Sequence, residues 1–279
     1  MSTQAKATTT AKPEGKNFSD MFSTFAIPVL VVLGFCIYFF VLGNPSNFEG
    51  NDVNNHAVKE GIGHVFGLMF KGGKIVGLLL SLVLMSLTFS IERFLSIGKA
   101  QGKGSAKDLV AKIKSLLSQG QIDAAIAECD KQQGSVANVT RATLVKYKEM
   151  QLVTDLSKDQ KVLALQKELE EATQLELPHL ERNLVIIATM ASVSTLIALL
   201  GTVLGMIKAF SALAAEGAGG QGALADGISE ALINTALGIG NSALATVMYN
   251  VFTSKIDGIT HTIDEIGFTI TQQFAASQK

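Results

Sequence analysis

Charged side chains are scarce in this sequence, and several long stretches have none at all. Asp, Glu, Lys and Arg make up 17% of the 279 residues, while apolar residues make up 48%. The mean hydropathy is +0.34. This composition is typical of a membrane protein rather than of a soluble domain.

The residues that build disulfides, metal sites and nucleotide sites are also few. Cys36 lies in an apolar stretch and Cys129 in a polar one, so a disulfide between them is not expected. The four His residues are scattered along the sequence, so a metal site is not expected. The segment GAGGQGALADG lacks the Lys-Ser/Thr of a phosphate-binding loop, and it predicts a turn. The sequence therefore predicts no enzyme, no metal site, no cofactor and no nucleic-acid partner.

Four stretches are long and apolar enough to cross a bilayer, which takes about 20 mostly apolar residues. The predicted transmembrane helices cover residues 21–44, 65–92, 183–215 and 227–255. The first follows a basic flank, as a signal peptide does. Its apolar core is too long for one, and no cleavage site of the A-x-A kind follows. We expect this helix to be retained.

Lys and Arg set the expected orientation, because they accumulate on the cytoplasmic side of a membrane protein. The tail 1–20 carries three Lys, and residues 93–182 begin with a run of basic residues, so both are expected in the cytoplasm. The segments 45–64 and 216–226 are the expected periplasmic connections. Both termini are thus cytoplasmic, with residues 256–279 forming a last helix.

Residues 93–182 form the largest soluble part, and their apolar spacing predicts helices. An amphipathic stretch from about residue 156 to 182 is predicted to run straight into the third membrane helix, with Pro178 kinking it without ending it. The expected fold class is an all-α membrane protein whose long transmembrane helices extend into a helical cytoplasmic domain.

The last two membrane helices are joined by a short loop, so they should be antiparallel neighbours. Thr202 follows Arg182 by 20 residues, and Thr235 precedes Lys255 by 20. At 1.5 Å per residue each threonine lies about 30 Å from its basic anchor, so the two should lie at one depth. The same counting places Lys208 level with Glu230.

Polar residues on the last helix fall on two faces. Thr235, Ser242, Thr246 and Tyr249 form one, and Glu230, Asn234 and Asn241 form the other. Such polarity is expensive against lipid, so these faces should look toward protein or a wet cavity. A membrane Thr can simply bond the carbonyl four residues earlier, and Lys208–Glu230 can be a purely structural pair. Taken together, the residues favour a lined pathway.

Two motifs in this hairpin resemble a known family. LERNLVIIATMASVSTLIALLGTVLGMIKAF (180–210) and GISEALINTALGIGNSALATVMYNVF (227–252) are similar to the ExbB/TolQ/MotA proton-channel family, with the ExbB/TolQ branch fitting best. The likeness extends more loosely to IERF in the second membrane helix and to QIDAAIAEC in the soluble part. The first membrane helix has no counterpart in the shorter members.

The resemblance implies a homopentamer in the bacterial inner membrane, surrounded by lipid. Its pore would hold the helices of an ExbD/TolR-like single-span partner, which carries a protonatable aspartate. Motion would pass to a TonB-like or TolA-like protein acting on the outer membrane. The threonine of the family's L-G-T motif falls on Thr202, the threonine of A-L-x-x-T-A-x-G on Thr235, and the acidic residue before A-L on Glu230. The resemblance thus implies that Thr202 and Thr235 contact the partner's carboxylate.

This chain departs from the family pattern at several positions. Thr195 and Leu244 stand where the family has proline, and Asn241 and Ser242 stand where small apolar residues are usual. These changes leave sodium open as the driving ion, although the lack of an added carboxylate favours protons. A TolQ-like role in envelope maintenance and a surface-motility stator also stay open. From other classes, a secondary transporter fits less well because the sequence lacks inverted-repeat halves. A passive scaffold would leave the hydroxyl stripe unexplained.

Overall fold

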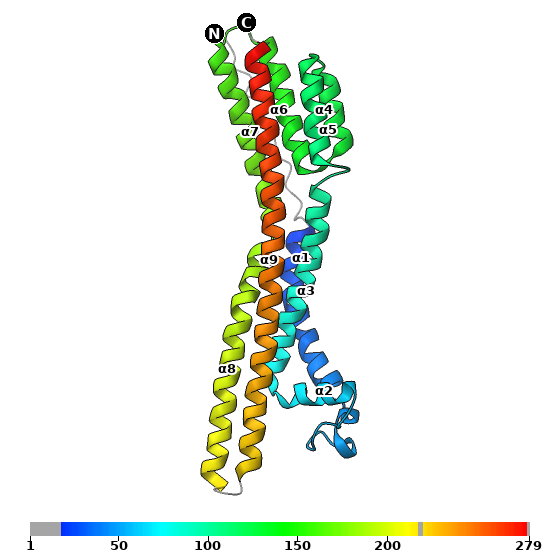
Figure 1. The fold of residues 1–279 in the computed structure, drawn as a ribbon, viewed down its shortest axis with the longest axis vertical. Helices are drawn as coiled ribbons and strands as arrows, with labels where there is room; N and C mark the ends of the chain where they lie inside the picture. The colour runs from blue at the N-terminus through cyan, green and yellow to red at the C-terminus, as the bar shows by residue number, and fades with distance from the viewer. Residues whose placement is uncertain (1–17, 217–219, 278–279) are drawn as a thin grey trace, which may run out of the picture.

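The computed structural model describes residues 18–216 and 220–277, so the predicted tail 1–20 lies almost wholly outside it. Within these ranges the chain is an elongated assembly of helices (Figure 1). In chain order they are α1 (Phe18–Cys36), continued by the π-helical turn η1 (Ile37–Leu42), then α2 (Ile62–Lys71), α3 (Lys74–Ala100), α4 (Ala106–Ser118), α5 (Ile122–Gln132), α6 (Gly134–Leu152), α7 (Lys158–Glu181), α8 (Leu184–Glu216) and α9 (Gln221–Ser277).

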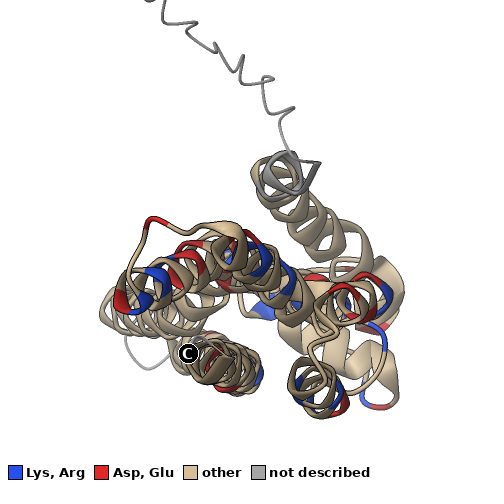
Figure 2. Cartoon of the chain, turned by 90° about the horizontal axis from the view of Figure 1, so that it is seen from above, with Lys and Arg blue, Asp and Glu red and all other residues tan. Residues whose placement is uncertain are grey.

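Four helical segments are long and apolar enough to span a membrane, which confirms the predicted all-α membrane fold. They are Thr24–Leu42, Lys74–Ala100, Lys158–Ala215 and Gln221–Ser277. In Figure 1 the hairpin of α8 and α9 occupies one end of the molecule. α3 lies beside α9, and α1 packs against α3. α4, α6 and α7 pack against the far half of α9. Figure 2 looks down on the α4–α7 end, where Lys, Arg, Asp and Glu colour the helices nearest the viewer.

The prediction of one helix over residues 65–92 is wrong, because two helices meet there. α2 ends at Lys71 and α3 begins at Lys74. Gly73 between them has φ +78°, in the left-handed region that side chains other than glycine adopt only with strain. Figure 1 shows α2 crossing the end of α3 at a steep angle.

The segment between α1 and α2 is a folded cap rather than an open connection. It contains the short 3-10 turns η2 (Pro45–Asn47) and η3 (Glu49–Asn51). Asn47 donates from Nδ2 to the carbonyls of Val41 and Leu42, at 2.8 and 3.0 Å. The cap thereby supplies partners for carbonyls that the end of η1 leaves free.

The prediction that one helix runs from the soluble part straight into the third membrane helix is also wrong. α7 passes through Pro178 but ends at Glu181, and α8 begins at Leu184. Between them Arg182 is extended, with ψ 140°, and Asn183 is left-handed, with φ 60°. Asparagine tolerates this conformation better than most residues, so the break falls where the sequence permits it.

A buried arginine on α3 stabilises this break. Arg93 is 1% exposed and forms two bonds with Glu92, from Nε at 2.7 Å and from Nη2 at 2.5 Å. Its Nη1 also faces the carbonyls of His179 and Leu180, both at 3.4 Å, and Asn183 donates to Glu92 at 3.1 Å. Carbonyls at a helix C-terminus lack partners within the helix, and a cation placed there satisfies them.

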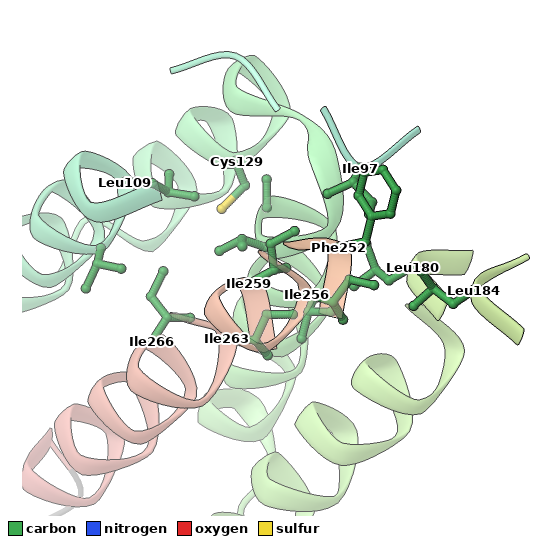
Figure 3. Packing of buried hydrophobic residues seen from close by; sticks show 14 of the residues in the cluster. Ile97, Leu109, Cys129, Leu180, Leu184, Phe252, Ile256, Ile259, Ile263 and Ile266 are labelled. Carbon is green, nitrogen blue, oxygen red and sulfur yellow. The ribbon is translucent and has the colours of Figure 1, made fainter. Parts of the chain in front are cut away.

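The soluble end is held by an apolar core around the last part of α9. Ile259, Ile263 and Ile266 on α9 point toward Leu109 of α4 and the other side chains drawn in Figure 3. Cys129 belongs to the same core, and burial raises the pKa of its thiol to about 12. The thiol is therefore neutral at physiological pH and packs as a small apolar side chain.

Small residues bring α8 and α9 close together. A methyl group added at Gly201 would meet Asn234, and one added at Gly205 would lie 2.9 Å from the carbonyl of Gly227. At Gly238 it would collide with Ala198 and lie 2.6 Å from the carbonyl of Ser194. α9 starts at Gln221, so the connection is shorter than the predicted loop 216–226. The hairpin is thus a close helix pair of the small-residue kind.

Gly238→Val should separate α8 from α9. Forcing extra methyl groups into a filled contact costs about 1–3 kcal/mol. We expect a lower midpoint of thermal unfolding for the purified protein in detergent. Gly240→Val is the matched control, because nothing lies within 4 Å of a methyl group at Gly240. Equal midpoints for the two variants would contradict the close packing.

Arg93→Met should destabilise the junction of α7 and α8. Removing one partner of a buried ion pair costs about 3–5 kcal/mol, because the remaining charge loses its compensation. Arg141→Met is the control, since Arg141 and Asp130 form an ion pair at 2.7 Å that is about half exposed, and such pairs contribute about 1 kcal/mol or less. The midpoints of thermal unfolding of the two variants test this. A larger fall for Arg93→Met than for Arg141→Met would show that Arg93 stabilises the junction, whereas equal falls would show that its contacts are dispensable.

Candidate functional site

The hairpin brings Thr202 of α8 and Thr235 of α9 into direct contact. Their Oγ1 atoms share a short hydrogen bond in which either hydroxyl can donate. Thr202 also lies 3.1 Å from the carbonyl of Ala198, and Thr235 lies 3.1 Å from that of Ala231. The two threonines therefore lie at one level of the helix pair, as their counting from Arg182 and Lys255 predicted.

The contact between Thr202 and Thr235 joins two helices, whereas a membrane threonine usually bonds only a carbonyl of its own helix. Each hydroxyl carries one hydrogen and can accept others. If both hydrogens went to backbone carbonyls, none would remain between Thr202 and Thr235. One hydroxyl therefore donates across to the other helix, and this pair can reverse its donor and acceptor when a third polar group approaches. Both side chains are half-buried, so their outer side stays accessible.

Asn234 and Asn241 lie inside the packing, not on a surface that another helix could reach. Asn234 is fully buried and donates to the carbonyl of Gly72 at 3.0 Å, which ties α9 to the turn before α3. Asn241 is 3% exposed and donates to Ser194 Oγ of α8 at 2.7 Å. This placement differs from the prediction that both line a pathway, because their face of α9 is covered by other helices of the same chain.

Ser242 and Thr246 lie on the opposite, more open face of α9. Ser242 is half-buried and Thr246 is exposed. Thr246 donates to the carbonyl of Ser242 at 2.8 Å, the local bond expected of a helical threonine. Of the two predicted polar faces, the one with Thr235 is thus the accessible one, and the one with Asn234 holds the bundle together.

Lys208 and Glu230 form an ion pair between α8 and α9, with Nζ 2.8 Å from Oε2. The Lys208 side chain is 71% exposed, whereas that of Glu230 is 18% exposed. Glu230 also packs against Gly73, where an added methyl group would collide with its carboxylate. Glu230 therefore contacts α8 and the start of α3 at once, and the N-terminal end of a helix favours a negative charge.

Sequence reasoning did not single out the acidic and basic residues at the α7–α8 break. The pair Glu92–Arg93 was visible only as part of IERF near the end of the second membrane helix. An ionic pair so close to an apolar span was the available signal, since such residues are costly unless paired. In the ranges 18–216 and 220–277, no three His, Cys, Asp or Glu side chains gather closely enough to hold a metal ion.

Comparison with known proteins finds relatives named ExbB or TolQ. Residues 136–265 match the profile described as the MotA/TolQ/ExbB proton channel family. A putative biopolymer transport protein ExbB-like 3 from Synechocystis sp. is 44% identical over 89 residues, 31% of this chain and 42% of the relative. The Tol-Pal system protein TolQ of Haemophilus influenzae is 39% identical over 88 residues, 32% of this chain and 39% of TolQ.

A longer match reaches an archaeal relative. A putative biopolymer transport protein ExbB homolog from Methanothermobacter thermautotrophicus is 24% identical over 196 residues, 70% of this chain and 65% of the relative. In all three matches the aligned part is less than two thirds of the relative's own length. The family region contains α8, the threonine contact and most of α9. Residues 136–265 of this chain are thus similar to the MotA/TolQ/ExbB proton channel family.

Proposed function

We propose that this chain is the channel subunit of a proton-driven stator in the bacterial inner membrane. With an ExbD-like single-span partner it would convert the proton motive force into mechanical work, passed to a TonB-like protein for transport across the outer membrane. The observation that carries the proposal is the contact between Thr202 and Thr235 in the family region.

The hairpin needs a partner to carry a proton, because it has no carboxylate of its own at this level. The stretches 183–207 and 231–254 contain no charged residue. A protonatable side chain must therefore come from another chain, which fits an aspartate on the partner's helix. In a low-dielectric pore, hydroxyls can accept a hydrogen bond from the neutral acid and donate one to the carboxylate. Thr202 and Thr235 offer both without adding a competing charge.

The exposed apolar surface of α8 supports assembly of several copies. Leu196, Leu199 and Leu200 are 63%, 60% and 54% exposed in the single chain. Lipid, partner helices and neighbouring copies would cover these residues. We propose a homopentamer around the partner helices, with both termini in the cytoplasm, since basic residues follow α3 and α9 crosses back at Lys255.

A TolQ-like role in envelope maintenance is the second candidate, because a TolQ protein is among the relatives. A stator for surface motility and a secondary transporter are further alternatives. A neighbouring gene for a single-span protein with a membrane aspartate would support the stator over the transporter. A TonB-like gene beside it would separate uptake from the Tol role.

Thr202→Val and Thr235→Val should each abolish energy-coupled function while the complex still assembles. Valine keeps the shape but removes the hydroxyl, so we expect uptake driven by the proton motive force to fall about a hundredfold or more, the scale of a lost proton-transfer group. Co-purification of the ExbD-like partner checks assembly, and envelope integrity is measured in parallel for the Tol role.

Two further variants control for the threonine substitutions. Thr202→Ser restores the hydroxyl and should restore most of the uptake. Thr260→Val removes a part-buried hydroxyl of α9 that bonds the carbonyl of Ile256 at 3.1 Å, and it should leave uptake unchanged. Normal uptake in both valine variants at the contact would overturn the proposal.

Exchanging the charges of Lys208 and Glu230 tests whether they act as a pair. Lys208→Glu and Glu230→Lys each place like charges together, so each single variant should lose energy-coupled uptake. The double variant restores opposite charges and should regain function. Exchanging Lys167 and Glu171, an exposed pair at 3.6 Å, is the control and should change nothing. Two single variants with full function would show that the pair is dispensable.

A further inference from the structure

A cavity of about 550 Å³ opens between α8 and α9 beside the α7–α8 break. Leu184 and Ile256, both labelled in Figure 3, form part of its apolar wall. Its polar lining comes from Glu181, Thr189, Ser192, Tyr249, Thr253 and Asp257. A cavity of this size, lined by hydroxyls and carboxylates, is large and polar enough to hold several waters.

One hydroxyl of the cavity lacks a hydrogen-bond partner among residues 18–216 and 220–277. Thr253 Oγ1 is buried and makes no hydrogen bond, although a helical threonine usually bonds the carbonyl four residues earlier. A buried polar atom without a partner is costly, and water in the adjacent space would satisfy it. Glu181 and Asp257 are exposed, and neither side chain forms an ion pair or hydrogen bond with any residue in the described ranges.

The cavity lies at one end of the polar face that begins at the threonine contact. On α9 this face runs through Thr235, Ser242, Thr246, Tyr249, Thr253 and Asp257, in steps of seven, four, three, four and four. On α8 it runs through Thr202, Thr195, Ser192 and Thr189, in steps of seven, three and three. From Thr235 to Asp257 the helix rises about 33 Å at 1.5 Å per residue, roughly the thickness of a hydrocarbon core.

We propose that Glu181 and Asp257 form the proton-release site at the inner end of this path. The inference rests on the proposed function and on the cytoplasmic placement of the α4–α7 end. The partner's carboxylic acid gives up its proton near Thr202 and Thr235, and waters along the hydroxyl face relay it. An O–H bond forms on one of the two carboxylates, and that proton then passes to bulk water, which restores the carboxylate.

The chemistry favours carboxylates at this position. Water in a narrow polar channel relays protons in either direction. A base at the inner end of the channel binds the protons there, so they leave the channel at that end. Two carboxylates from different helices face this cavity. One of them can therefore accept a proton while the other has just released one. Because Asp257 is carried by α9 and Glu181 ends α7, movement at the α7–α8 break would change their separation.

Proton flux through the reconstituted complex tests this site. The full chain with its ExbD-like partner is placed in liposomes that enclose a pH-sensitive dye, and a potassium diffusion potential drives the protons. We compare wild type, Thr202→Val, Asp257→Asn, Glu181→Gln and the double carboxylate variant. Asp257→Glu keeps the acid, and Asp264→Asn is the matched control, seven residues further along α9, exposed and outside the cavity.

We expect the double variant to lose flux about a hundredfold or more, as for a removed proton-transfer group. Asp264→Asn should conduct as wild type does, and Asp257→Glu, which keeps the acid, should conduct more than Asp257→Asn. A high concentration of imidazole, which can take the proton in place of the carboxylates, should restore part of the flux in the double variant but none in Thr202→Val. A double variant that does not assemble is replaced in the same assay by the two single variants.

Two results would overturn the release site while leaving the proposed function intact. One is wild-type flux in the carboxylate variants. The other is a loss of flux that imidazole does not relieve, since the loss would then be structural. A wild-type complex that conducts no protons, or one that conducts equally with Thr202→Val, would instead show that the proposed function is wrong, and the release site with it.

Discussion

Two helices can bring hydroxyl groups into contact only where their backbones approach closely. Gly201, Gly205 and Gly238 allow that approach along α8 and α9, because any side chain there would collide with the facing helix. Thr202 then meets Thr235, and Asn241 reaches Ser194. The polar groups of the hairpin depend on this contact, since without it each hydroxyl would bond only its own helix.

Both ends of the hairpin are fixed by charges, and its middle carries none. At one end Lys208 and Glu230 join α8 to α9, with Glu230 also against the turn before α3. At the other end Arg93 and Glu92 hold the break between α7 and α8. Charge placed at the ends leaves the middle of the hairpin without a fixed charge, and a fixed charge there would bias the ionisation of any carboxylate nearby.

Much of the hairpin could be predicted from the sequence, because helical periodicity and distance from charged anchors both follow from counting residues. Thr202 and Thr235 were expected at one depth, and Lys208 opposite Glu230, and the structure places them so. The breaks at Gly73 and Asn183 could not be predicted this way. An apolar run looks the same whether one helix or two pass through it, and each break depends on partners distant in sequence, such as Arg93.

The sequence by itself determined the class of fold, the number of long apolar helices and the resemblance to a family, since these depend on composition and local motifs. Only the tertiary structure decided which polar face of α9 is open. Asn234 and Thr235 are neighbours in the chain, yet Asn234 is buried against Gly72 while Thr235 keeps an accessible side. The same holds for Glu181 and Asp257, which meet at one cavity only because α7 ends where α8 and α9 lie side by side. Periodicity assigns residues to faces, but the packing of the other helices decides what each face meets.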